Sequence, residues 1–86
     1  MNMTDAYLIE IVNYCNRWPL SLMDSECVYD ICKSLNLTQA KLLKYIDLGF
    51  KKEYLKYAKK AYPWPIVPTE QGLEFARIPA ESGVQP

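Results

Sequence analysis

Apolar residues recur every three or four positions through the first fifty residues, which is the spacing of helices that bury one face. The pattern predicts three helices, over residues 5–17, 24–35 and 38–48. Thr4, Asp24 and Thr38 are suitable N-caps, because their side-chain oxygens can accept hydrogen bonds from free amides at the start of each helix. Pro19 ends the first helix, and Gly49 is predicted to end the third in a left-handed conformation.

Residues 50–62 predict a fourth helix with one basic face. At about 100° per residue, one side of this helix gathers Phe50, Tyr54, Tyr57, Ala58 and Ala61. The opposite side gathers Lys52, Lys56, Lys59 and Lys60. Pro63 stops the helix, since proline cannot continue it.

The chain changes character after residue 62. Prolines at positions 63, 65 and 68 argue against a helix there, and the extended runs 65–69 and 73–78 predict a β-hairpin whose turn uses Gly72. A short helix over residues 69–77 is the competing interpretation. The expected fold is therefore mostly α: one domain over residues 1–79, with about four helices and a C-terminal β-hairpin, followed by a frayed tail over residues 80–86.

Residues 28–47 fit the pattern of a helix-turn-helix corner, which requires apolar, small, turn and capping residues at fixed positions. The stretch supplies them in register: Ile31, Cys32, Leu35, Asn36, Leu37, Thr38, Leu42 and Tyr45. Cys32 is the small residue where the helices touch, and Asn36 tolerates the left-handed conformation of the turn. A tight corner between two core helices satisfies part of the same pattern.

The corner and the sequence after it resemble small winged-helix regulators of the phage and prophage type. The resemblance covers residues 25–78, and the run TEQGLEF at residues 69–75 is similar to the wing segment of those proteins. It implies a winged-helix-like fold and transcription regulation through DNA. The chain departs from the pattern in one respect. A minimal winged helix has its wing directly after the recognition helix, whereas here the predicted helix 50–62 intervenes, so either helix 38–48 or helix 50–62 could enter a DNA groove.

The net charge is zero, but the charges are segregated along the chain. Residues 1–36 hold five acids and two bases, residues 37–62 hold seven lysines and two acids, and residues 63–86 hold three acids and one base. The middle segment is thus about +5 between two acidic flanks, which favours contact with a polyanion.

The candidate nucleic-acid-binding residues lie in this basic segment. Glutamine can read an adenine edge, and lysine can contact phosphate or guanine. The set is Gln39, Lys41, Lys44, Lys51, Lys52, Lys56, Lys59 and Lys60. A solvated helix face explains the lysines of residues 50–62 equally well, because lysine carries little base information.

A protein-binding adaptor or inhibitor module is the alternative function. Leu43 and Trp64 are its candidate anchors, since aromatic and apolar side chains are typical of interface centres. The expected partner is therefore duplex DNA or a host protein. A homodimer would suit a two-fold DNA site.

Composition argues against most enzyme chemistry. The chain has no histidine, and its three cysteines, Cys15, Cys27 and Cys32, fall within apolar helical patterns. No imidazole can activate a nucleophile, no Cys-x-x-Cys pair offers a zinc site, and the thiols are expected to be buried and reduced. The apolar runs are too short for a membrane span, and the first residues lack the basic patch of a secretory signal. We expect a cytoplasmic protein without enzyme activity, metal or cofactor.

Overall fold

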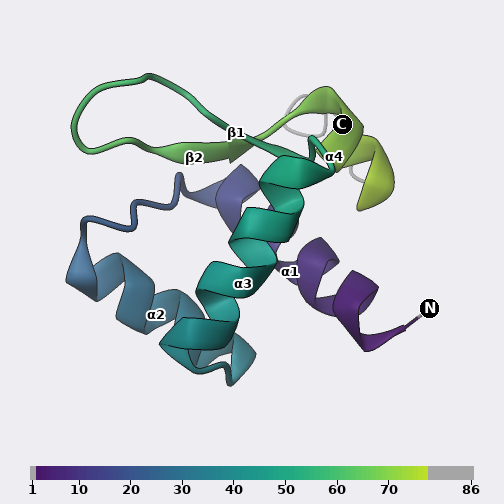
Figure 1. Ribbon diagram of the computed structural model, residues 1–86, viewed down its shortest axis with the longest axis horizontal. Helices are drawn as coiled ribbons and strands as arrows, with labels where there is room; N and C mark the ends of the chain where they lie inside the picture. Colours follow the sequence, from purple (N-terminus) through teal and green to yellow (C-terminus); the bar gives the residue numbers. More distant parts are fainter. Residues whose placement is uncertain (1, 78–86) are drawn as a thin grey trace, which may run out of the picture.

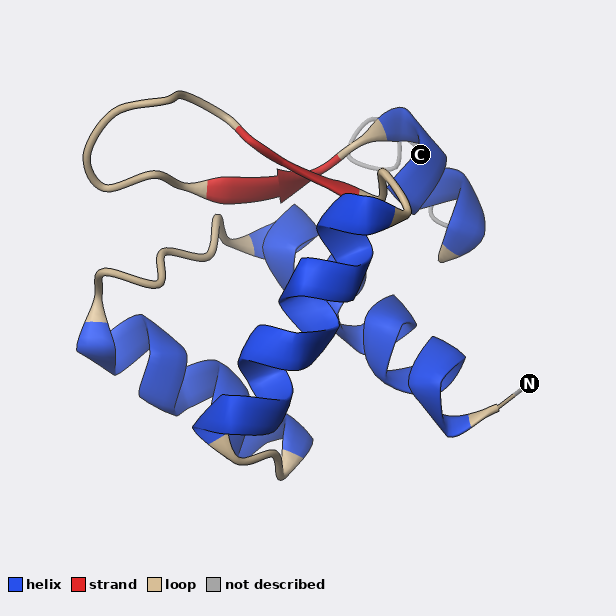
Figure 2. Cartoon of the chain, in the orientation of Figure 1, coloured by secondary structure: helices blue, strands red, loops and turns tan. Residues whose placement is uncertain are grey.

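The chain forms four helices and one β-hairpin, in a computed structural model that describes residues 2–77. Three helices come first, then the hairpin, then a last short helix (Figures 1 and 2). The elements are α1 (Met3–Arg17), α2 (Ser25–Leu35), α3 (Gln39–Lys51), β1 (Leu55–Tyr57), β2 (Ile66–Pro68) and α4 (Glu70–Phe75). The prediction of a mostly helical domain with a β-hairpin after the long helices is confirmed.

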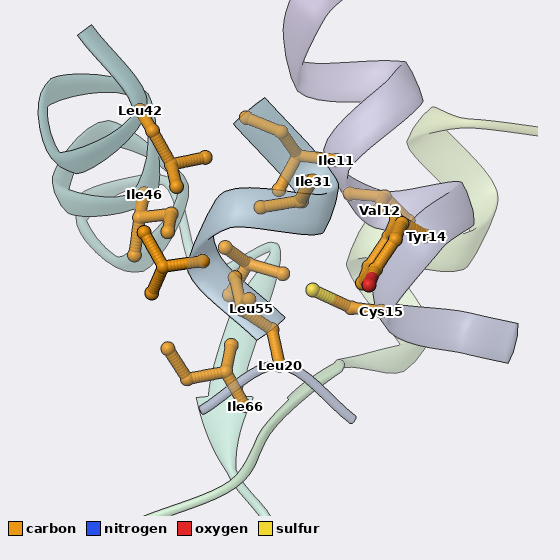
Figure 3. Packing of buried hydrophobic residues seen from close by; sticks show 11 residues of the cluster. Ile11, Val12, Tyr14, Cys15, Leu20, Ile31, Leu42, Ile46, Leu55 and Ile66 are labelled. Carbon is orange, nitrogen blue, oxygen red and sulfur yellow. The ribbon is translucent and has the colours of Figure 1, made fainter. Parts of the chain in front are cut away.

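The helices and the hairpin enclose one core. α3 crosses in front of α1, and the hairpin lies over one end of both helices (Figure 1). β1 packs against α3, β2 packs against α1, and α4 packs against α1 and β2. In Figure 3, Leu42 and Ile46 of α3 lie across the core from α1, and Leu20, Leu55 and Ile66 close the core on the side of the hairpin. Burial of each such aliphatic side chain contributes about 1.5–3 kcal/mol.

The helix starts follow the capping residues closely. Asp24 accepts hydrogen bonds from the amides of Glu26 and Cys27, and Thr38 accepts one from the amide of Lys41. Both caps are those predicted. The first helix starts earlier than predicted, because Asn2, not Thr4, accepts the amide of Asp5 at 2.8 Å.

The corner between α2 and α3 has the predicted conformation. Asn36 is left-handed, with φ 56° and ψ 48°, and the amide of Leu37 donates to the carbonyl oxygen of Cys32 at 2.9 Å. Ile31 and Leu42 are fully buried. Cys32 and Leu37 are only half-buried, so the centre of the corner is packed, whereas its edge is partly accessible to solvent.

The predicted helix over residues 50–62 is wrong. α3 continues past Gly49 to Lys51, and the chain then turns and enters β1. In a helix over residues 50–62, Leu55 would lie on the lysine side, exposed to water. In the strand Leu55 is 3% exposed and packs on Gly49, where a Cβ atom would lie 2.7 Å from Leu55 Cδ1. Burial of Leu55 therefore outweighs the helical pattern, and Gly49 lies inside the helix, where it leaves room for Leu55, rather than at its end.

The hairpin is also not the predicted one. β1 and β2 pair antiparallel, with Leu55 opposite Pro68 and Tyr57 opposite Ile66. The predicted strand 65–69 overlaps β2, but its partner precedes it in the sequence, because residues 73–77 form no strand. The competing interpretation of a short helix is correct, as residues 70–75 form α4. The predicted frayed tail, residues 80–86, lies outside the described residues.

A glycine is required at position 72 because the main chain of Tyr54 approaches it closely, and not because the chain turns there. It lies within α4, its φ is not positive, and its amide donates to the hydroxyl oxygen of the N-cap Thr69 at 2.9 Å. A Cβ atom on Gly72 would overlap the main-chain carbonyl of Tyr54. The ring of Phe75 stacks on the ring of Tyr54, with centroids 4.2 Å apart. α4 is thereby held against the start of the hairpin.

Candidate nucleic-acid interface

α3 presents a lysine stripe, which consists of Lys41, Lys44 and Lys51 on the helix and Lys52 at its C-cap. All four side chains are exposed. At 3.6 residues per turn they fall within an arc of about 100° and extend over about 16 Å of helix. The major groove of B-DNA is about 12 Å wide and admits an α-helix. The lysine stripe therefore has the shape of a surface that can follow one groove.

Asp47 borders the lysine stripe and reduces its charge. Asp47 Oδ2 lies 3.4 Å from Lys51 Nζ, and this is the only ion pair within residues 2–77. Both side chains are largely exposed, so the ion pair contributes only about 0–1 kcal/mol to stability. Lys51 can therefore leave Asp47 and bind another anion, such as a phosphate, at little cost. Four lysines and one aspartate leave the stripe at about +3.

The other three candidate lysines lie on the hairpin. Lys56 is on β1, exposed, and on the face opposite to Leu55, because successive strand side chains alternate. Lys59 and Lys60 are exposed in the hairpin loop, residues 58–65, which extends away from α3 (Figure 1). The common helical face predicted for Lys52, Lys56, Lys59 and Lys60 does not exist, since the structure divides them between the end of α3 and the hairpin.

Gln39 and Leu43 lie apart from the lysine stripe. Gln39 is the first residue of α3 and lines a hollow of about 270 Å³ with Val28 and Cys32 of α2. Leu43 is 45% exposed and lies one turn further along the same side of α3. The structure thus does not bring Gln39 together with the lysines.

Trp64 lies in an apolar groove between the hairpin and the connector that joins α1 to α2 (residues 18–24). We call this the apolar groove; it has a volume of about 320 Å³ and is lined by Leu22, Met23, Tyr57 and Trp64. The rings of Tyr57 and Trp64 meet edge to face, with centroids 5.3 Å apart. Ser21 Oγ donates to the carbonyl oxygen of Pro63 at 2.8 Å and holds the two walls of the groove together.

Sequence reasoning found only one residue of the apolar groove. Tyr57 was predicted to lie on the apolar side of a helix over residues 50–62, and Leu22 and Met23 were not among the predicted site residues. The alternation of Leu55, Lys56 and Tyr57 was the available signal, because in a strand it sends the tyrosine to the same face as the leucine.

An acidic hollow lies beside the start of α2, on the side of α1. It measures about 980 Å³, and its lining includes the exposed ring of Trp18 and the carboxylates Asp24, Glu26 and Asp30. The hydroxyl of Tyr14 donates to Asp30 Oδ2 at 2.8 Å. Burial of the ring, followed by this hydrogen bond, raises the pKa of Tyr14 well above its usual value. The hollow gives the α2 side of the molecule a charge opposite to that of α3.

The cysteines differ in their surroundings. Cys15 is buried, as predicted, and burial raises the pKa of its thiol to about 12, with a smaller contribution from Cys27. Cys27 and Cys32 are only half-buried, contrary to the prediction, and the three thiols are free. Within residues 2–77, no group of Cys, Asp and Glu side chains could hold a metal ion. No helix in that part of the chain is long and apolar enough to cross a membrane.

The described surface therefore offers charge and apolar contact in three separate regions: the lysine stripe, the apolar groove and the acidic hollow. Comparisons with protein-family models, curated proteins and solved structures gave no significant match.

Proposed function

We propose that the domain binds duplex DNA through α3 and acts as a small transcription regulator of the phage or prophage type. The observation that carries the proposal is the lysine stripe, which lies on α3, the second helix of the corner that fits the helix-turn-helix pattern. In such corners the second helix enters the major groove. The stripe would neutralise phosphates along that groove, and this neutralisation supplies most of the affinity of a basic protein for DNA.

The order of elements supports the same proposal. A minimal winged helix has its wing directly after the recognition helix, and here β1 begins at Leu55, shortly after α3 ends at Lys51. The predicted helix over residues 50–62, which was the one departure from the winged-helix pattern, does not form. Lys56 on β1 would give such a wing an additional contact to the DNA backbone, whereas Lys59 and Lys60 lie in the loop that extends away from α3.

The lysines favour affinity over sequence recognition. Lysine is a point charge suited to phosphate, and the four lysines of the stripe carry little base information. Gln39, the residue suited to an adenine edge, lies on the other side of α3. A regulator of this kind would need a second copy on the DNA to reach a specific site. The proposal includes a cytoplasmic location and no catalysis or cofactor.

A non-enzymatic protein-binding module is the second candidate. The observation that favours it is the exposure of Leu43 and Trp64, at 45% and 37%. Large apolar side chains on a surface are typical of interface centres. A protein partner that binds at Leu43 or at Trp64 would bind with weak salt dependence, whereas phosphate contacts are strongly salt-dependent.

The test compares two pairs of substitutions that remove the same charge. Lys44→Ala with Lys51→Ala removes half of the lysine stripe, and Arg17→Ala with Lys33→Ala removes two exposed cations from α1 and α2. Fluorescence anisotropy with a labelled duplex should give weaker binding for the first pair and unchanged binding for the second. Equal loss in both pairs would mean that DNA senses only the total charge, and α3 would not be the binding element.

A further inference from the structure

The two chain segments that continue from the walls of the apolar groove carry opposite charges. The hairpin loop on one side carries Lys59 and Lys60, and the start of α2 on the other side carries Asp24 and Glu26. Figure 1 shows the loop and the start of α2 at the same end of the molecule, one above the other. All four side chains are exposed, and within residues 2–77 none of them forms an ion pair. The charges are thus accessible to another molecule, while Asp24 also accepts the amides of Glu26 and Cys27, and both acids also line the acidic hollow.

We propose that the apolar groove is the interface of a homodimer, formed with a second copy of this chain by a two-fold rotation. A two-fold interface must be complementary to itself. Rotation about the centre of the groove would bring the two apolar surfaces together. It would also bring the loop lysines of each copy opposite the acidic start of α2 in the other copy. The zero net charge of the chain removes the overall repulsion that would oppose such pairing.

Trp64 is the central anchor of this interface. Its φ is 55°, a left-handed conformation that bulky residues rarely adopt, and its amide donates to the carbonyl oxygen of Ala61 at 2.7 Å. A conformation of this kind persists where the surrounding structure enforces it, commonly at binding sites. The ring remains 37% exposed and rests against Tyr57. Trp and Tyr are the residues most often found at the centres of interfaces.

The same rotation would suit a two-fold DNA site. An axis along the viewing direction of Figure 1 keeps α3 of both copies on one side of the dimer. The molecule measures 34 Å along its longest axis, so two copies side by side have their centres at about the spacing of successive major grooves, about 34–36 Å. This consequence rests on the proposed DNA binding, whereas the dimer itself does not.

Sedimentation velocity without DNA, over a concentration series, tests the dimer directly. The wild-type chain should pass from monomer to dimer as concentration rises. Met23→Asp places a charge in the apolar groove and should weaken the dimer by about tenfold or more. Met3→Asp changes a similarly exposed methionine at the start of α1 and should leave the dimer unchanged. A wild-type chain that stays monomeric throughout the series would overturn the proposal, whatever its affinity for DNA.

Charge reversal tests the two-fold arrangement. One variant carries Lys59→Glu and Lys60→Glu; the other carries Glu26→Lys with Asp24→Asn, since asparagine retains the helix cap. Each variant alone should dimerise about tenfold more weakly or worse, and an equal mixture of the two should restore dimer formation, because each reversed side then meets its complement.

The control for these variants is Lys41→Glu with Lys44→Glu on α3, which reverses two charges away from the groove and should dimerise as the wild type does. Thermal melting of each variant verifies that it is folded. A mixture that remains monomeric, or a singly reversed variant that dimerises like the wild type, would overturn the proposed interface.

Discussion

Leu20 and Ile66 join the connector between α1 and α2 to the hairpin by two main-chain hydrogen bonds. The amide of Leu20 donates to the carbonyl oxygen of Ile66 at 3.0 Å, and the amide of Ile66 donates to the carbonyl oxygen of Leu20 at 2.8 Å. Both side chains are fully buried. The hairpin is therefore fixed to the connector as well as to α3, and this pairing determines where the apolar groove and the loop lysines lie.

Truncation of Leu20 should destabilise the whole domain. Leu20→Ala leaves a cavity between the connector and the hairpin, so the free energy of unfolding should fall by about 2–5 kcal/mol in urea denaturation. Leu43→Ala removes the same atoms from an exposed position on α3 and should change stability by less than about 0.5 kcal/mol. Equal effects of the two substitutions would show that the connector does not belong to the core.

Gly72 and Gly49 should respond differently to alanine. In Gly72→Ala the new methyl group meets a main-chain carbonyl that cannot move alone, so unfolding should become easier by about 1–3 kcal/mol. In Gly49→Ala the methyl group meets the end of the Leu55 side chain, which can shift, and alanine favours the helix by about 1 kcal/mol. Thermal unfolding of the two variants should therefore differ clearly. An unchanged melting temperature for Gly72→Ala would mean that α4 is not docked against Tyr54.

The buried thiol of Cys15 should make the fold sensitive to alkaline pH. Its pKa is raised from 9.0 to about 12, so the unfolded chain loses this proton at a lower pH than the folded chain does. The stabilisation is complete below pH 9 and is lost as pH rises toward 12, at about 1.4 kcal/mol per pH unit. Cys15→Val removes this contribution. The difference in unfolding free energy between wild type and variant should therefore shift steadily with pH in this range, and a constant difference would contradict the assignment.

The first half of the fold could be predicted because local signals agree with the tertiary structure. Asp24 and Thr38 cap the helices that their positions indicate, and Asn36 adopts the left-handed turn that its side chain tolerates. The apolar spacing of the three long helices faces the core that the structure contains. Where capping residues, turn residues and apolar periodicity indicate the same boundaries, a single sequence is sufficient to predict the helices and the turn between them.

The second half could not be predicted because distant contacts decide it. Residues 50–62 have a helical pattern, but α3 ends at Lys51, and burial of Leu55 against Gly49 places the rest of this segment in a turn, a strand and a loop. Gly72 was predicted at a turn, whereas its role is a close approach to Tyr54, which lies far away in the sequence. The sequence was enough to select the candidate lysines. It could not show which of them share a surface, because that depends on where α3 ends.

The salt dependence of DNA binding by the wild-type chain tests the central claim most directly. The association constant for a short duplex, measured by fluorescence anisotropy at increasing salt, should fall linearly on a double-logarithmic plot. Each phosphate contact contributes about 0.9 to the slope. Contacts from the four lysines of the stripe alone predict a slope of about −3.6, and Lys56 on the hairpin would steepen it to about −4.5. A slope near zero, or no binding at low salt, would contradict the account and favour the protein-binding module.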